Sequence, residues 1–459
     1  MIGKLALPAI RELIGSGDDK TLGEVVNRWH PADVAELARH LDRREQNHVL
    51  RLLEPARAAP AFAYLDLDIQ RRLLQSLPES ETASIIGAMS ADDRTTLLAK
   101  LPQSQSERLL DLLSVEERVI ARSLLEHAPG TVGRLMSPDY VDVRREWTIA
   151  HVLDHVREHG QDSETLNVIY VVDEQNILID DLRIREVLLA PLGARVADIV
   201  DDRFVSLKTT DDRKTAVEIF RKYDRVALPV VDAQGRLAGI VTLDDVLDVA
   251  DRVATEEIQK FGGLEALDLA YMNTPLTVMV RKRASWLVIL FVGEMLTATA
   301  MGFFEGSIAR AVVLALFVPL IISSGGNAGS QAATLIIRAL ALGEARPRDW
   351  WLVLRREFAS GLMLGLILGS IGFLRIALWS AVSTMYGPHW ILVALSVSIS
   401  ITCVVVWGGI TGAMLPFLLR SLGFDPATSS APFVATLVDV TGLVIYFSIS
   451  LFLLQGTLL

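Results

Sequence analysis

Five long apolar stretches in the C-terminal part of the chain constrain its fold more than any other feature. Each is close to, or longer than, the about 20 residues that an α-helix needs to cross a bilayer. Backbone polar groups in hydrocarbon must be satisfied within the segment, so each stretch is expected to be a helix. The expected spans are residues 284–303, 311–341, 358–380, 391–419 and 431–457.

Charge divides the 459-residue chain into two unlike parts. Residues 1–283 carry 48 acidic and 36 basic side chains, whereas residues 284–459 carry seven acidic and eight basic ones. The acidic N-terminal part, residues 1–283, lacks the Lys/Arg surface that phosphates require, so no nucleic-acid partner is expected. Its negative charge could simply keep it soluble, or it could attract cations.

Basic residues also indicate an orientation for the spans. They precede the first span (Arg281–Arg283), lie between the second and third, and follow the fourth at Arg420. Because cytoplasmic loops are enriched in Lys and Arg, the N-terminal part is expected in the cytoplasm and the C-terminus outside. The N-terminus shows no signal-peptide pattern.

A hydrophobic residue recurs every twelve positions in the front part. From Trp29 the series continues at Leu41, Leu53, Leu65, Leu77, Met89, Leu101 and Leu113. Helices this short are marginal alone but stable when stacked. The repeat predicts an all-α superhelical N-domain over residues 1–133.

Residues 134–253 contain a duplication with an offset of 59 residues. "NVIYVVDEQNILIDD" from Asn167 aligns with "VALPVVDAQGRLAGI" from Val226, and both continue into a helical segment. This α/β duplication resembles a pair of CBS domains. The resemblance implies that Thr242 would contact a nucleotide's phosphate and Asp245 its ribose. In the first copy the corresponding positions are Arg183 and Glu186, and Asp180 replaces Gly239.

Residues 319–331 of the second span are unusually polar for their depth. Pro319, Gly325 and Gly326 weaken a helix, so a break is expected here. Asn327 and Gln331 are four residues apart and share a helix face. Two interpretations remain: close packing through small residues, or a pathway lined by carbonyls and amides.

The last span contains a lone carboxylate, Asp439, near its middle. A carboxylate inside a membrane is costly and indicates a functional site. Thr436 lies three residues earlier on the same face, and Glu294 in the first span is a second acidic candidate.

Three segments together resemble the signatures of the MgtE family of magnesium channels. They are "GEMLTATAMGFFE", "PLIISSGGNAGSQAATLIIRALALGE" and "FDPATSSAPFVATLVDVTG". The resemblance implies a multidomain homodimer in the bacterial cytoplasmic (inner) membrane, with a linker (plug) helix over 254–283 and a five-helix transmembrane domain over 284–459. It also implies a Mg²⁺ pore on the two-fold axis between the protomers, lined largely by the second and fifth spans, with Asp439 as its carboxylate. Because Mg²⁺ retains its water, backbone carbonyls and amides from Gly325 to Gln331 are expected to hydrogen-bond the ion's water shell.

The same resemblance implies that cytoplasmic Mg²⁺ closes the channel. Acidic residues expected to bind regulatory Mg²⁺ occur in the N-domain, the second CBS copy, the linker and the cytoplasmic mouth. They are Asp92, Asp93, Asp244, Asp245, Asp248, Glu256, Glu257 and Asp425. ATP is a further expected ligand, at Thr242 and Asp245.

Alternatives to a magnesium channel stay open at this point. No G-x-x-x-x-G-K-[ST] motif or nucleophile constellation is present, so an enzyme is not expected. A pathway for Co²⁺ or Mn²⁺ and a cation–proton exchanger both fit the same residues. A membrane-tethered CBS sensor without transport would need neither Asp439 nor the polar segment.

Overall fold

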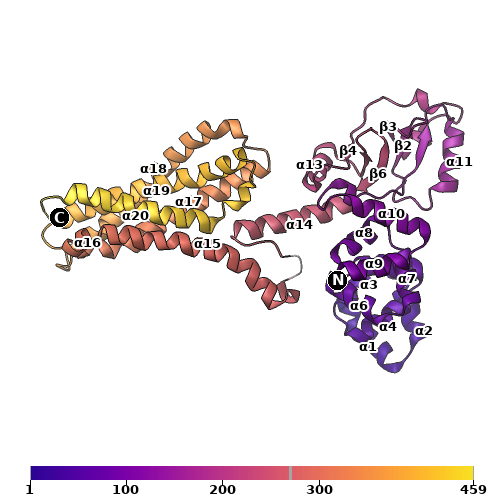
Figure 1. The fold of residues 1–459 in the computed structure, drawn as a ribbon, viewed down its shortest axis with the longest axis horizontal. Helices are drawn as coiled ribbons and strands as arrows, with labels where there is room; N and C mark the ends of the chain where they lie inside the picture. The colour runs from indigo at the N-terminus through magenta and orange to yellow at the C-terminus, as the bar shows by residue number, and fades with distance from the viewer. Residues whose placement is uncertain (1, 268–270, 458–459) are drawn as a thin grey trace. The chain divides into compact units, whose positions relative to one another are not determined.

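The computed structural model describes residues 2–267 and 271–457. The chain forms two compact units, Met1–Val253 and Ala254–Leu459 (Figure 1). Helix α14 (Leu243–Phe261) contributes residues to both units.

The first unit begins with a stack of short helices, as the twelve-residue repeat predicts. Several helices pack on the helix two positions along the chain, as α1 does on α3, α3 on α5 and α8 on α10. The repeated hydrophobic residues from Leu41 to Leu113 are all buried in one continuous core. The helices are α1 (Ile2–Ser16), α2 (Asp19–Val26), α3 (Pro31–Ala38), α4 (Arg43–Arg51), α5 (Pro55–Ala63), α6 (Leu67–Ser76), α7 (Glu79–Gly87), α8 (Ala91–Lys100), α9 (Gln103–Asp111) and α10 (Val115–Glu126).

Two three-stranded sheets follow in the same unit, and their order is β1-β2-β3 and β4-β5-β6. Each has one parallel and one antiparallel pairing. The register repeats with the 59-residue offset: Val168 pairs with Arg183, and Ala227 pairs with Thr242. The elements are β1 (Asp142–Arg144), α11 (Ile149–His159), β2 (Val168–Val172), β3 (Leu178–Arg183), α12 (Ile184–Leu189), β4 (Leu207–Lys208), α13 (Arg213–Tyr223), β5 (Ala227–Val231) and β6 (Leu237–Thr242).

The linker differs from the single helix expected over residues 254–283. Helix α14 ends at Phe261, and Gly263 follows with a φ of +72°, a conformation that ends helices and that glycine adopts without strain. The next long helix, α15 (Leu276–Phe303), starts only after Pro275 and continues into the first span. Part of the segment between them, residues 268–270, lies outside the described residues.

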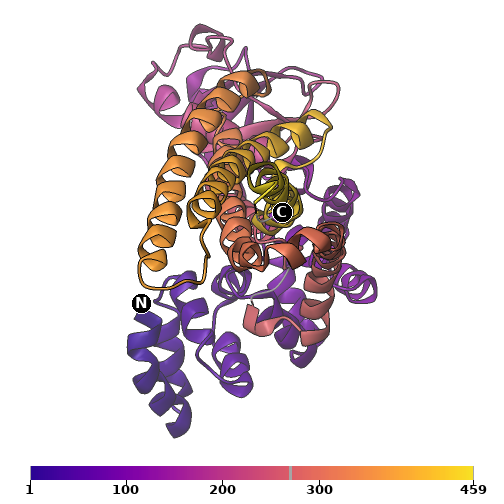
Figure 2. The same cartoon turned by 90° about the vertical axis from the view of Figure 1, so that its left-hand side faces the viewer.

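Among the described residues of the second unit, five helices are long and apolar enough to cross a membrane. Helices α17, α19 and α20 pack against one another, α18 lies on α19, and α15 lies on α20 (Figures 1 and 2). The helices that follow α15 are α16 (Glu305–Arg310), α17 (Val318–Ala341), α18 (Trp350–Ser380), α19 (Trp390–Ser421) and α20 (Ala431–Leu454).

The break expected in the second span does not occur. Helix α17 is continuous from Val318, and Pro319 occupies its first turn, where the missing N–H costs no helical hydrogen bond. Gly325 and Gly329 are buried against α19, and a β-carbon on the facing Gly408 or Gly412 would overlap their carbonyl oxygens. These glycines therefore allow two helix backbones to approach closely.

Candidate functional site

Asp439 lies half-buried in the middle of α20, beside the glycine pair of α17. A β-carbon on Gly326 would be 3.4 Å from Asp439 Oδ1. Gly325 faces away from Asp439, toward Val404 on α19 and Val438 on α20. Of the two adjacent glycines, Gly326 is thus the one beside the carboxylate.

Helix α17 presents a polar stripe on its exposed side. Ser323, Asn327, Gln331 and Thr334 follow one another at helical spacing, and all four are exposed in the single chain. Asn327 Nδ2 donates a hydrogen bond to Ser323 Oγ at 3.3 Å. Amides at this depth are tolerated where they face water or protein rather than lipid. The stripe therefore indicates a surface that contacts water or another protein surface rather than lipid.

Glu294 and Thr436 line a groove between α15 and α20, together with apolar residues such as Leu287 and Phe291. The two helices touch here, because a β-carbon on Gly293 would lie 3.0 Å from Thr436 Cγ2. Thr436 thus faces α15, on the side of α20 that also carries the groove.

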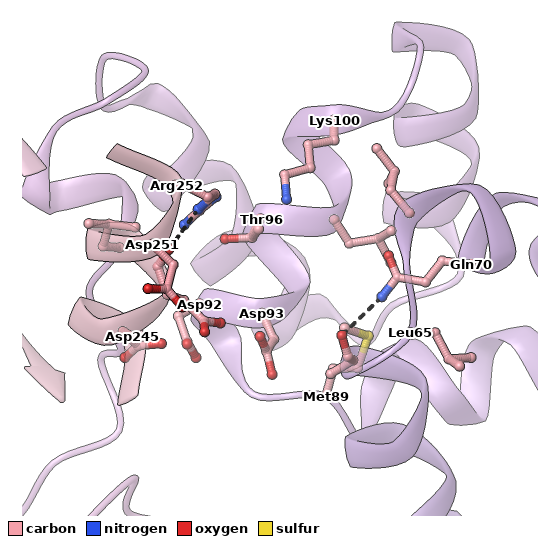
Figure 3. A pocket seen from close by; sticks show the side chains of 15 residues that line it. Leu65, Gln70, Met89, Asp92, Asp93, Thr96, Lys100, Asp245, Asp251 and Arg252 are labelled. Carbon is pink, nitrogen blue, oxygen red and sulfur yellow. Dashed lines mark hydrogen bonds between the residues drawn. The ribbon is translucent and has the colours of Figure 1, made fainter. Parts of the chain in front are cut away.

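A second polar site lies in the first unit, where α8 meets the start of α14 (Figure 3). Its cavity of about 320 Å³ is lined by Asp92, Asp93, Asp245, Asp248 and Asp251, with Lys100 and Arg252 at one side. Asp92 is only 6% exposed, and its Oδ1 is buried without a hydrogen-bond partner among the described residues.

The carboxylates of this cavity disfavour one another's charge. Burial, reinforced by Asp92, raises the pKa of Asp93 to about 6. Burial and then Asp92 also raise the pKa of Asp245, although Thr242 Oγ1 donates a hydrogen bond of 2.6 Å to Asp245 Oδ2. A cation in the cavity would relieve this repulsion.

Sequence reasoning missed several members of this cluster. Asp251 lines the cavity. Burial, with a smaller contribution from Asp92, raises the pKa of Glu164 to about 7. Burial also raises the pKa of Asp139. The charge of Arg94 opposes this increase, and the charge of Asp92 adds to it. Asp139 and Glu164 come from irregular segments without a periodic signal, so only the fold brings them to Asp92.

The predicted regulatory residues belong to different units. Asp92, Asp93, Asp244, Asp245 and Asp248 lie in the first unit, whereas Glu256, Glu257 and Asp425 lie in the second. Within the second unit, Lys260 Nζ is 2.9 Å from Asp425 Oδ2. Sequence reasoning did not predict this ion pair.

The geometry of the acidic cavity bears on how it could hold a cation. Within residues 2–267 and 271–457, no three His, Cys, Asp or Glu side chains converge closely enough to hold a metal ion directly. Mg²⁺ dehydrates reluctantly and is commonly held by one or two carboxylates through several retained waters. The carboxylate set and the room in the cavity fit such a hydrated ion.

The two CBS-like copies differ at the predicted nucleotide position. Gly239 has no room for a side chain, because a β-carbon there would lie 2.7 Å from the Ser137 carbonyl oxygen. In the first copy the Asp180 carboxylate instead accepts hydrogen bonds from the backbone N–H groups of Asp181, Asp201 and Asp202. The Arg183 N–H donates to Glu186 Oε2 at 3.0 Å, closing the first turn of α12.

Known protein families and relatives match both the N-terminal and the C-terminal part of the chain. Residues 318–449 match the model of the MgtE divalent cation transporters, residues 29–130 match the MgtE intracellular N domain, and residues 196–252 match the CBS domain. A magnesium transporter MgtE from Thermus thermophilus is 41% identical over 73% of this chain and 72% of its own length. The magnesium transporter MgtE from Enterococcus faecalis is 29% identical over 72% of this chain and 70% of its own length.

Solved structures resemble the N-terminal part. The cytosolic domain of the Mg²⁺ channel MgtE in complex with ATP is 36% identical, with a TM-score of 0.52, and the match covers 53% of this chain and 99% of that one. The soluble part of a magnesium transporter is 27% identical, also with a TM-score of 0.52, over 55% of this chain and 99% of that one.

Proposed function

This chain belongs to the MgtE family of divalent cation transporters, and from that premise we propose that it is a magnesium channel. Mg²⁺ would enter the cytoplasm down its electrochemical gradient, driven by a membrane potential worth about 2.3 kcal/mol per charge per 100 mV. The protein would act as a transporter without catalysing a reaction.

The observation that carries the proposal is the juxtaposition of α17 and α20 in the second unit. Asp439 supplies a negative charge in an otherwise uncharged helix, and Gly326 leaves the space beside it open. Asn327 and Gln331 add exposed amides on α17. A carboxylate can hold hydrated Mg²⁺ electrostatically while amides and carbonyls bond its water shell.

A homodimer would explain why the α17 stripe is exposed in the single chain. Two copies related by a two-fold axis would face their polar stripes toward one shared path and place two Asp439 side chains near it. In the bilayer, the Arg cluster between α17 and α18 would lie in the cytoplasm and the C-terminus outside.

The acidic cavity would serve as the regulatory site. Mg²⁺ bound among Asp92, Asp93, Asp245 and Asp248 would turn repulsion into attraction between α8 and α14. A ligand shifts a conformational equilibrium only by its differential affinity, so Mg²⁺ would favour the state in which these carboxylates are closest. We propose that this state is closed. Asp244, Glu256, Glu257 and Asp425 are included among the regulatory residues by family resemblance.

The function is tested by ion flux through the purified chain in liposomes, with Mg²⁺, Ca²⁺, Mn²⁺ and Co²⁺ compared. Mg²⁺ flux that needs no proton gradient supports the channel. Flux that follows the proton gradient would favour a cation–proton exchanger. Preferential flux of Co²⁺ or Mn²⁺ would make one of these ions the transported substrate, and absence of any flux would favour a sensor without transport.

Regulation is tested in the same liposomes. Neutralising Asp92, Asp93, Glu256 and Glu257 together should keep the channel open at high cytoplasmic Mg²⁺.

ATP is a second proposed ligand of the first unit. The related cytosolic domain was solved in complex with ATP. Thr242 and Asp245 are hydrogen-bonded to each other at the start of α14, so a nucleotide there would compete with this pair and with Mg²⁺ for Asp245. Calorimetry with ATP on the wild type and on Thr242→Val, with and without Mg²⁺, tests this.

A further inference from the structure

Helix α11 carries three histidines at intervals of four residues. His151, His155 and His159 follow one another along one side of the helix, and none of the three is buried. The acidic cavity is lined by α8, α14 and their neighbours, and its lining does not include α11. Neither the pore nor the regulatory site proposed above uses these side chains.

The imidazole rings touch one another and a tryptophan. The ring centroids of His155 and His159 are 4.3 Å apart and nearly stacked. Trp147 lies edge-on to His151 at 4.4 Å and to His155 at 5.0 Å. The ring of His155 therefore lies between those of Trp147 and His159.

A backbone hydrogen bond sets the tautomer of His159. Its Nδ1 lies 3.2 Å from the carbonyl oxygen of His155. Because a carbonyl can only accept, Nδ1 carries the proton, and Nε2 of the neutral ring keeps a free lone pair. Metal-binding histidines are commonly prepared in this way, with one ring nitrogen bonded to a carbonyl and the other to the metal.

His155 and His159 lie four residues apart on one face of α11. This is the helical spacing at which two histidines can bind one metal ion.

We propose that His155 and His159 bind one late first-row transition-metal ion, of the class of Zn²⁺, Ni²⁺ or Cu²⁺. Imidazole suits these ions, whereas Mg²⁺ takes oxygen ligands. The described residues contain no converging group of three protein ligands, so water completes the coordination after the stacked rings turn toward one ion. The site discriminates against Mg²⁺ and does not depend on the proposed transport function.

Calorimetry of the full-length protein with Zn²⁺, in millimolar Mg²⁺ that fills oxygen sites, tests the proposal. We expect one Zn²⁺ per chain, loss of that binding in the His155→Gln/His159→Gln double variant, and retention in His40→Gln, which changes an exposed histidine of the helical stack. Absence of Zn²⁺ binding in the wild type, or unchanged binding in the double variant, would overturn the proposal.

A measurement on Trp147 covers the case in which the double variant folds poorly. Cu²⁺ bound to His155 should quench the fluorescence of the nearby Trp147. Addition of Cu²⁺ should therefore reduce the tryptophan emission of the wild type and leave the emission of Trp147→Phe unchanged. Equal quenching of the two proteins would contradict the assignment.

Discussion

Gly326 on α17 faces Asp439 on α20, so closely that a β-carbon on the glycine would lie 3.4 Å from the carboxylate oxygen Oδ1. That distance is an ordinary van der Waals contact, and the next neighbour, Ala435 Cβ, is at 3.5 Å. Gly326 therefore differs from Gly325 and Gly329, which have no space for a side chain. The face of α17 that carries Gly325 and Gly329 packs tightly, whereas the adjacent face, at Gly326, leaves room beside the Asp439 carboxylate.

Substitution of the two kinds of glycine should separate packing from function. At Gly329 a β-carbon would lie 2.8 Å from Val434 Cγ1 and 3.0 Å from the Gly408 carbonyl oxygen. Overpacking of this kind costs about 1–3 kcal/mol. We expect Gly329→Ala to lower the thermal midpoint of the purified protein by several degrees and Gly326→Ala to leave it nearly unchanged. Equal midpoints for both variants would contradict the packing described for α17.

Asn327→Leu should reduce Mg²⁺ flux more than stability. The substitution removes an exposed amide from the α17 stripe without adding atoms to the packed face. Flux in liposomes and the thermal midpoint are measured together. Ser370→Leu is the matched control, since it places a leucine at an exposed position of α18. If Asn327→Leu conducts like this control, the amide contributes nothing to the ion path.

The buried ion pair between Arg225 and Asp181 should be costly to break. Arg225 Nη1 is 3.2 Å from Asp181 Oδ2, and the side chains are 17% and 2% exposed. Arg225→Met leaves a buried carboxylate unpaired, at a cost of about 3–5 kcal/mol in urea unfolding. Arg157→Met, which breaks an exposed pair with Asp154, should cost at most about 1 kcal/mol. Similar losses for the two variants would contradict the buried pair's role.

Stability of the first unit should depend on pH through its raised carboxyl pKa values. Burial raises the pKa of Glu164 in the folded state to about 7, above its ordinary value of 4.5. The folded state therefore holds the proton more tightly, and Glu164 opposes folding progressively as pH rises from about 4 to 7. Without Mg²⁺, we expect Glu164→Gln to stabilise residues 1–253 at pH above 7 and to have little effect near pH 4.

The relevant measurement is urea unfolding with a chelator present, with Glu174→Gln at an exposed site as control. Added Mg²⁺ should shrink the advantage of Glu164→Gln at high pH, because the cation offsets the same repulsion. A variant that gains equally at both pH values would show that the effect is not a titration.

Periodic features of the sequence predicted the architecture well. From Leu41 to Leu113 the twelve-residue repeat marked residues that are all buried, and the 59-residue offset reappears in the strand registers. The apolar stretches identified the five long helices, but α15 and α18 begin at Leu276 and Trp350, earlier than expected. Hydropathy reports the apolar part of a span, whereas the helix continues through charged residues such as Arg281.

Features that depend on tertiary contacts were not predictable in this way. The low helix propensity of Gly325 and Gly326 predicted a break, but close packing against Gly408 and Gly412 keeps α17 helical. Asp139 and Glu164 come from segments far from Asp92 in sequence, yet the fold brings each close enough for the Asp92 charge to raise its pKa. The linker helix was placed across Gly263, whose left-handed conformation ends it.

The role of Asp439 is central, and Mg²⁺ influx into liposomes through Asp439→Ala and Asp439→Asn tests it most directly. Removing the charge removes the only carboxylate of α20 while replacing a costly membrane group with tolerated ones. We predict that both variants remain folded with the wild-type oligomeric state and lose most of their Mg²⁺ flux. Near-normal Mg²⁺ flux through either folded variant would contradict the account.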